Sequence, residues 1–169
     1  MFPTSLISIL ILSVGLATNP DTESPVHCQV PCGIYGDMMR IDMLMEDAST
    51  IEKGMAQITA LSAESKPNFN QVVRWTMNKD KHAQSIQDMV SSYWLAQRIK
   101  APKKPDAAAR VAYLQRLELL HGITVAAMKC KQTTDASHVT RLRELAKKFS
   151  GAYFSKEDLK HLKEHKSGH

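Results

Sequence analysis

The sequence predicts an all-α protein, an up-and-down four-helix bundle preceded by an N-terminal metal-binding hook. Apolar residues recur every three or four positions in four separate stretches, as on the buried face of an amphipathic helix, and no stretch alternates like a strand. Aromatic residues make up only 6% of the chain, and Gly and Pro number seven each, which favours helices over a turn-rich β structure. Ahead of the first helical stretch stands HCQVPCGIY, residues 27–35, in which two cysteines lie four positions apart.

Residues 1–26 are predicted to be a signal peptide plus a pro-segment that is removed. Residues 6–17, LISILILSVGLA, form an apolar run that suits a signal peptide and is short for a membrane span, although a short membrane anchor is an alternative. Polar, Pro-containing TNPDTESPV follows. We expect export to a periplasm, a lumen or the extracellular space, with no stable membrane association after cleavage. A processing protease would then leave His27 as the amino terminus.

The hook, residues 27–35, and the helical bundle, residues 37–154, together form one predicted domain, residues 27–154. The first helix runs from Asp37 to about Leu61 and is followed by SKPN, residues 65–68. The second runs from about Phe69 to Ile99, ahead of two prolines. Asp106 is placed to cap the third helix, and the loop TTDAS, residues 133–137, precedes a fourth.

The helical periodicity also predicts which apolar positions each helix carries toward the core. On the first two helices these positions are Ile41, Leu44, Ala48, Ile51, Met55, Ile58, Val72, Val73, Ala83, Ile86, Val90 and Tyr93. On the last two they are Val111, Leu114, Leu117, His121, Val125, Met128, Val139, Leu142, Leu145, Phe149 and Tyr153. The methionines of the first helix are expected in the core and at an interface rather than around a metal.

Charge and cysteine count limit the function further. The formal net charge of +5 attracts anions in general, and removing residues 1–26 would raise it because they hold Asp21 and Glu23 but no Lys or Arg. No aromatic RNA-binding motif or zinc finger is present, so we expect no nucleic-acid partner. Three cysteines make a disulfide scaffold an unlikely expectation, and Cys130, in the helical pattern far downstream, is expected to be a partly buried small apolar residue.

The C-terminal residues 155–169 are predicted to form a basic tail that contains histidines. His161 and His165 lie four positions apart, and His169 ends the chain. Two histidines at this spacing share one face of a helix and can bind a divalent metal. The simpler interpretation is a solvated basic tail.

The hook can hold a transition metal. Two thiolates in a tight turn can close on one ion, Pro31 stiffens that turn, and Gly33 permits an unusual backbone angle. If the chain begins at His27, the terminal amine, the amide of Cys28 and the imidazole of His27 become nitrogen ligands. Such a nitrogen and sulfur set suits divalent nickel or copper in square-planar geometry. A disulfide between Cys28 and Cys32, or a structural zinc, remains open from the residues alone.

HCQVPCGIY resembles the H-C-x-x-P-C-G-x-Y hook of the nickel-containing superoxide dismutases. Each fixed position of that motif is present, namely His27, Cys28, Pro31, Cys32, Gly33 and Tyr35. The similarity continues through RIDML at 40–44, NQVVRWTMNKDKHA at 70–83 and SSYWLAQRIK at 91–100. It covers most of residues 27–154.

This resemblance implies a homohexamer of four-helix bundles with one nickel ion per subunit. The nickel ligands would be His27 through its amine and imidazole, Cys28 through its amide nitrogen and thiolate, and Cys32 through its thiolate. Tyr35 would guard the open face of the metal and order water there. Asp42 would hold the axial imidazole, and His82 stands where the family often has an arginine behind this acid.

The implied activity is that of an enzyme, a nickel-dependent superoxide dismutase. It would convert superoxide to dioxygen and hydrogen peroxide through a Ni(II)/Ni(III) cycle, as an antioxidant oxidoreductase. The alternative is an exported, non-catalytic helical bundle that binds a metal or a partner and whose hook is never unmasked. The two differ in whether Val26 is removed from His27.

Overall fold

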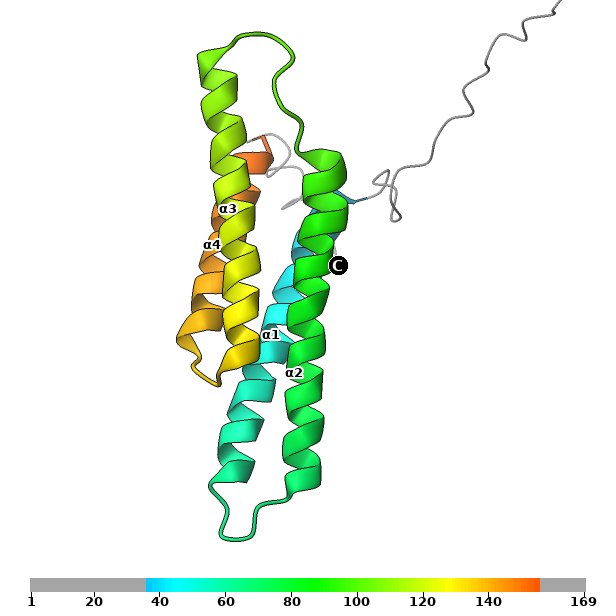
Figure 1. Cartoon of the computed structure of the whole chain (residues 1–169), viewed down its shortest axis with the longest axis vertical. Helices are drawn as coiled ribbons and strands as arrows, with labels where there is room; N and C mark the ends of the chain where they lie inside the picture. Colours follow the sequence, from blue (N-terminus) through cyan, green and yellow to red (C-terminus); the bar gives the residue numbers. More distant parts are fainter. Residues whose placement is uncertain (1–35, 156–169) are drawn as a thin grey trace, which may run out of the picture.

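The computed structural model describes residues 36–155, in which all regular structure is helical. The helices are α1 (Asp37–Ser62), α2 (Phe69–Met89), the π-helix η1 (Val90–Arg98), α3 (Ala107–Gln132) and α4 (Ser137–Tyr153). Each long helix runs antiparallel to the one before it, and both α1 and α3 pack on α2 and α4 (Figure 1). This confirms the predicted all-α four-helix bundle. The predicted hook, the leader and the tail lie outside the described residues.

Short polar side chains fix several helix ends. The Asn68 side chain accepts a 3.2 Å hydrogen bond from the backbone N–H of Gln71 at the start of α2. Asp106 does the same for Ala109 N–H at 2.9 Å, which confirms the predicted cap of α3. Each cap satisfies one of the N–H groups that the first turn of a helix leaves without a partner. Within the described part of the chain, no helix is long and apolar enough to cross a membrane.

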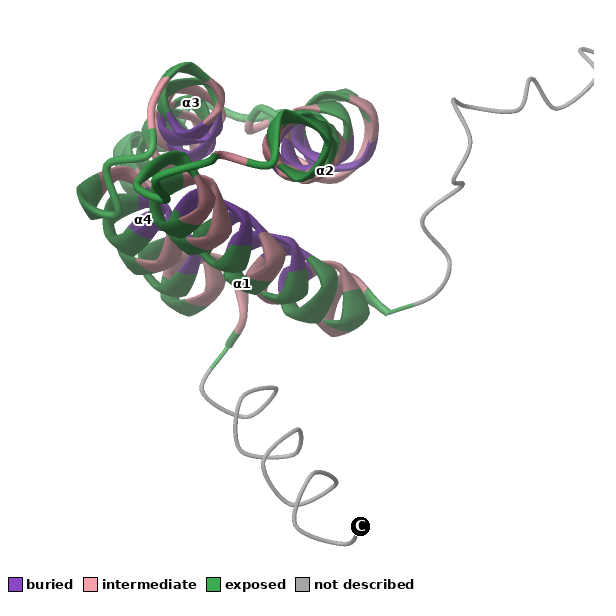
Figure 2. Ribbon diagram, turned by 90° about the horizontal axis from the view of Figure 1, so that it is seen from below, coloured by how far each residue is buried: buried purple, intermediate pink, exposed green. Residues whose placement is uncertain are grey.

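The core lies along the axis of the bundle, where the inner faces of the helices meet (Figure 2). The predicted apolar positions of α1, α2, η1 and α4 are mostly buried there. The exceptions are Val73, which is 55% exposed, and Val72, Ile58 and Tyr153, which are half-buried. Of the α1 methionines, Met55 is fully in the core, while Met38 and Met45 pack against its edge. Burial of these faces supplies the main stabilisation of the bundle.

The predicted face of α3 is wrong. Val111 is 66% and Leu114 46% exposed, and His121 is exposed as well. The buried residues of this helix are instead Leu120, Ile123, Ala126, Ala127 and Cys130. Apolar residues occur on more than one side of α3, so periodicity alone does not select its inner face. The structure selects the side with small residues, because these let the helix approach its neighbours closely.

The second predicted helix, from about Phe69 to Ile99, is not a single α-helix. Its last part is η1, whose wider turns place the adjacent residues Tyr93 and Trp94 both fully in the core. Side-chain hydroxyls mark the change, because Ser91 and Ser92 both donate to the carbonyl of Asp88, at 3.1 and 2.6 Å. Sequence periodicity gives no warning of this change of helix type.

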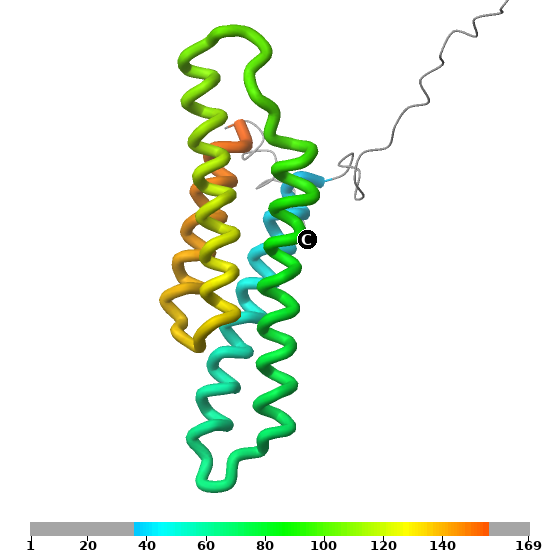
Figure 3. Tube along the Cα trace, in the orientation of Figure 1, coloured from blue at the N-terminus to red at the C-terminus, as the bar shows by residue number. Residues whose placement is uncertain are grey.

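The first turn of α1, the end of η1 and the last turn of α4 lie at the same end of the bundle (Figure 3). At the opposite end, the α1–α2 hairpin extends beyond the turn that joins α3 and α4 (Figures 1 and 3). The predicted hook joins the bundle directly ahead of α1. The end of the bundle that holds the start of α1 is therefore the one to search for residues that serve the hook.

Candidate functional site

The predicted ligands His27, Cys28 and Cys32, together with Tyr35, lie outside the described residues, and their roles stay predictions. Within residues 36–155, no three or more His, Cys, Asp or Glu side chains come together as a metal site would require. The third cysteine, Cys130, is fully buried, and burial raises the pKa of its thiol to about 11. Because a metal ligand must be a thiolate, Cys130 is unsuited to that role.

Asp42 lies exposed in the second turn of α1, about 7.5 Å along the helix axis from Asp37. The Nδ1 atom of His82 is 2.6 Å from Oδ1 of Asp47, a mostly buried residue further along α1. The basic residue that the sequence suggested behind Asp42 therefore pairs with a different carboxylate.

The described residue cluster closest in sequence to the hook is centred on Asp37, the first residue of α1. Its carboxylate accepts hydrogen bonds from the hydroxyl of Tyr93, from Nη2 of Arg98 at 2.5 Å and from the hydroxyl of Tyr153 at 2.6 Å. Tyr93 and Arg98 come from η1, and Tyr153 is the last residue of α4. We call these four residues the Asp37 cluster.

The electrostatics of the Asp37 cluster follow from these contacts. Burial alone would raise the pKa of Asp37, but hydrogen bonds from Tyr153, Tyr93 and Arg98 outweigh it and lower this pKa below its usual value. Burial and the neighbouring carboxylate raise the pKa of Tyr93 to about 12 and also raise the pKa of Tyr153. At neutral pH the cluster therefore holds one carboxylate, one guanidinium and two neutral phenols.

Two further arginines surround the Asp37 cluster. The Arg40 guanidinium lies 5.0 Å from the centre of the Tyr93 ring, and the Arg116 guanidinium lies 5.9 Å from that of Tyr153. Nε of Arg40 and Nε of Arg98 are buried and have no hydrogen-bond partner within the described residues. A buried N–H without an acceptor is costly. This end of the bundle thus offers positive charge and two arginine N–H donors that no described residue accepts, beside a third such buried donor, Nε1 of Trp94.

The sequence did not reveal the Asp37 cluster. Tyr93 and Tyr153 were interpreted as core positions, and Asp37 only as the start of a helix. Two features of the sequence could have pointed to the cluster. One is an apolar helical stretch that ends in Arg98, and the other is an acidic residue, Asp37, shortly after the hook. Neither specifies that the residues meet, because 56 to 116 positions separate them in the chain.

A second buried charge is structural. Lys79 is 2% exposed, and its ammonium donates to the carbonyls of Cys130 and Lys131, at 2.7 and 2.8 Å, and to Asp80 at 2.8 Å. These carbonyls belong to the last turn of α3, where helix geometry leaves them without partners and the helix dipole favours a cation. Lys79 therefore fastens the middle of α2 to the end of α3.

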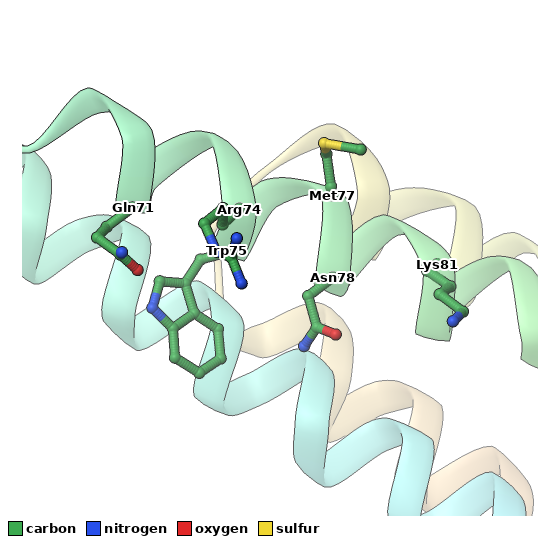
Figure 4. Close-up of a pocket in the computed structure, with 6 residues that line it drawn as sticks. All are labelled: Gln71, Arg74, Trp75, Met77, Asn78 and Lys81. Atoms are coloured by element: carbon green, nitrogen blue, oxygen red, sulfur yellow. The ribbon is translucent and has the colours of Figure 1, made fainter.

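The surface of α2 also bears a cavity of about 650 Å³, which none of the predicted site residues lines. Figure 4 shows its lining, which consists of Gln71, Arg74, Trp75, Met77, Asn78 and Lys81. All six come from the first half of α2, which lies toward the end of the bundle opposite the start of α1. We assign the cavity no role in the candidate site.

The chain was compared with families of known proteins. The family model described as nickel-containing superoxide dismutase matches residues 22–157. Comparison with curated proteins and with solved structures found no match. The family match spans the hook and the whole bundle, and it confirms both the resemblance carried by HCQVPCGIY and the prediction of a nickel-containing oxidoreductase. The chain belongs to the family of nickel-containing superoxide dismutases.

Proposed function

We propose that the hook binds one nickel ion per subunit through His27, Cys28 and Cys32. The observation that carries this proposal is the intact motif HCQVPCGIY, inside the family match. The donor set fits the metal, since two thiolates and nitrogen donors are ligands that late transition metals prefer. Bound there, nickel would supply one-electron redox chemistry between its divalent and trivalent states.

The reaction proposed is the disproportionation of superoxide. Two superoxide anions and two protons give one dioxygen and one hydrogen peroxide, so one superoxide loses the electron that the other gains. Tyr35 is proposed to guard the open face of the site and to order the water that delivers protons. Asp42 is proposed to hold the imidazole of His27. The basic charge of the chain supports attraction of the substrate anion.

The hook requires a free amine at His27, so the proposal includes removal of residues 1–26. We propose that a signal peptide directs export and that a protease cleaves between Val26 and His27. The apolar run at residues 6–17 and the polar segment after it support this order of events. Without cleavage, the nitrogen of His27 is an amide and the ligand set is incomplete.

We further propose that the protein assembles as a homohexamer. The exposed side chains of α2 support a surface that another subunit covers, because Phe69, Val73 and Met77 are 73%, 55% and 67% exposed. They are spaced four positions apart and therefore share one side of the helix. Exposed apolar surface of this kind is typical of an interaction face.

The first experiment is intact mass measurement on the mature protein from its own source, under native and then denaturing conditions. We expect a denatured chain that starts at His27 and one additional nickel ion per chain in the native spectrum. A chain that still carries Val26 and holds no nickel would contradict the proposal. It would favour the non-catalytic alternative instead.

A further inference from the structure

The Asp37 cluster ties the start of α1 to two other helices. Asp37 is the first residue of α1, and its carboxylate side chain is only 15% exposed. Its three donors come from η1 and from the last residue of α4. Hydrogen bonds to a charged group are stronger than those between neutral groups. The first residue of α1 is thus fixed more firmly than helix capping requires.

Gly36 controls the direction in which the chain enters α1. Its φ of 69° and ψ of 61° lie in the left-handed region, which other residues adopt at a cost. A Cβ atom at this position would also lie 3.0 Å from Cβ of Met39. The chain therefore enters α1 through a left-handed turn that glycine permits, directly before the residue that the cluster fixes.

The same end of the bundle has hydrogen-bond donors to spare. Arg40 packs on Tyr93, Arg98 pairs with Asp37, and each keeps a buried Nε–H without an acceptor in the described part of the chain. Backbone carbonyls and thiolates are acceptors of the kind that these groups lack. The segment nearest in sequence, residues 27–35, carries both.

Chain length limits where that segment can be. Cys32 precedes Asp37 by five positions, and five residues span at most about 18 Å when fully extended. Nickel bound at Cys32 would therefore stay near this end of the bundle whatever path the hook takes. Positive charge and unused donors suit a segment whose proposed ligands are two thiolates and a deprotonated amide.

We propose that Asp37 is a positioning residue, which together with Tyr93, Arg98 and Tyr153 forms the seat that holds the nickel hook, residues 27–35, on the bundle. Arg40 and Arg98 supply their free N–H groups to the hook. Asp37 acts through the backbone at Gly36 and touches neither metal nor substrate. This inference rests on the proposed nickel binding by the hook and adds the residues that orient it.

The test uses the full chain processed to begin at His27 and loaded with Ni²⁺. In the Asp37→Asn variant, the amide cannot balance the charge of Arg98 or accept all three hydrogen bonds. We expect nickel release to a chelator to become about tenfold faster, as loss of an outer-shell partner of a metal site typically causes. We also expect the electronic absorption of the bound nickel to shift, which a loss of bundle stability alone would not produce.

Glu52→Gln is the matched control. Glu52 pairs with Arg143 at 2.8 Å, so this variant also removes an ion pair between α1 and α4, but away from the hook end. We expect its nickel release and absorption to equal those of the parent. Equal acceleration in both variants, or an unchanged absorption and release rate in Asp37→Asn, would overturn the positioning role.

Tyr153→Phe keeps the carboxylate of Asp37 and removes one of its three hydrogen-bond donors. This variant tests the positioning role if Asp37→Asn does not fold. We expect nickel release to become about threefold faster, in line with the loss of one of several supporting hydrogen bonds. A release rate equal to that of the parent would reject the seat. If the parent itself binds no nickel, the proposed function fails first, and the two failures are distinguished.

Discussion

The hydroxyl of Tyr153, the last residue of α4, donates a 2.6 Å hydrogen bond to the carboxylate of Asp37, the first residue of α1. The bond joins the two ends of the helical chain across 116 positions. This hydrogen bond links α1 and α4 at the end of the bundle that the hook joins. The stability of the bundle should respond to its removal.

Tyr153→Phe should lower the free energy of unfolding by about 2 kcal/mol, because the bond is made to a charged acceptor. Urea denaturation of the metal-free chain measures this. Tyr113→Phe is the control, since Tyr113 is half-buried and its ring lies beside Arg110, but its hydroxyl makes no hydrogen bond to any of residues 36–155. We expect a change close to zero there. Equal losses in both variants would mean that the cost comes from removing any tyrosine hydroxyl and not from this hydrogen bond.

Alkaline pH should destabilise the protein through Tyr93. Its pKa is raised to about 12 in the folded protein and lies near 10 when the chain is unfolded. A raised pKa stabilises the fold fully below pH 10, and this contribution is lost as pH rises toward 12. Denaturation curves at pH 9 and pH 12 should therefore show a larger fall in stability for the parent than for Tyr93→Phe. Parallel falls would argue against this linkage.

Lys79→Met should lower the free energy of unfolding by about 3 kcal/mol, because it leaves one buried and one partly buried carbonyl of α3 without this donor. Thermal and urea unfolding provide the measurement. Lys81→Met, on the same helix but exposed, is the matched control and should change stability little. A neutral Lys79→Met variant would show that the carbonyls find other partners.

Cysteine replacements distinguish nickel binding by the hook from nickel binding by the bundle. In a chain that begins at His27, Cys28→Ser and Cys32→Ser should each abolish stoichiometric nickel binding, because the proposed site loses a thiolate. Cys130→Ala should bind nickel like the parent, because Cys130 is buried in the core. Metal analysis after gel filtration gives the ratio. Full nickel binding by both serine variants would exclude the proposed ligand set.

The exposed side of α2 should govern assembly. Met77→Lys places a charge on that side and should shift the protein toward smaller species at low concentration. Sedimentation velocity reports the distribution. Val111→Lys is the control, since Val111 is 66% exposed on α3. Assembly that is lost in the control and kept in Met77→Lys would place the interface on α3 instead.

Sequence periodicity predicted the number and order of the helices because each inner face repeats with the helical period. It failed on α3, where apolar residues lie on more than one side and the pattern selected Leu114, which is exposed, and passed over Leu120, which is buried. It missed η1, because a π-helix differs from an α-helix by hydrogen bonds that composition does not encode. The hook motif indicated nickel through a local pattern, whereas the Asp37 cluster depends on packing between distant segments.

The partners of Asp37 also impose an order on biosynthesis. Tyr153 follows Asp37 by 116 positions. The carboxylate of Asp37 can therefore accept the hydrogen bond from Tyr153 only after the helical region has been translated. A protease that exposed His27 on the nascent chain would release the hook before its support existed. Cleavage before His27 is therefore best timed after α4 has been made, when Tyr153 can bind Asp37.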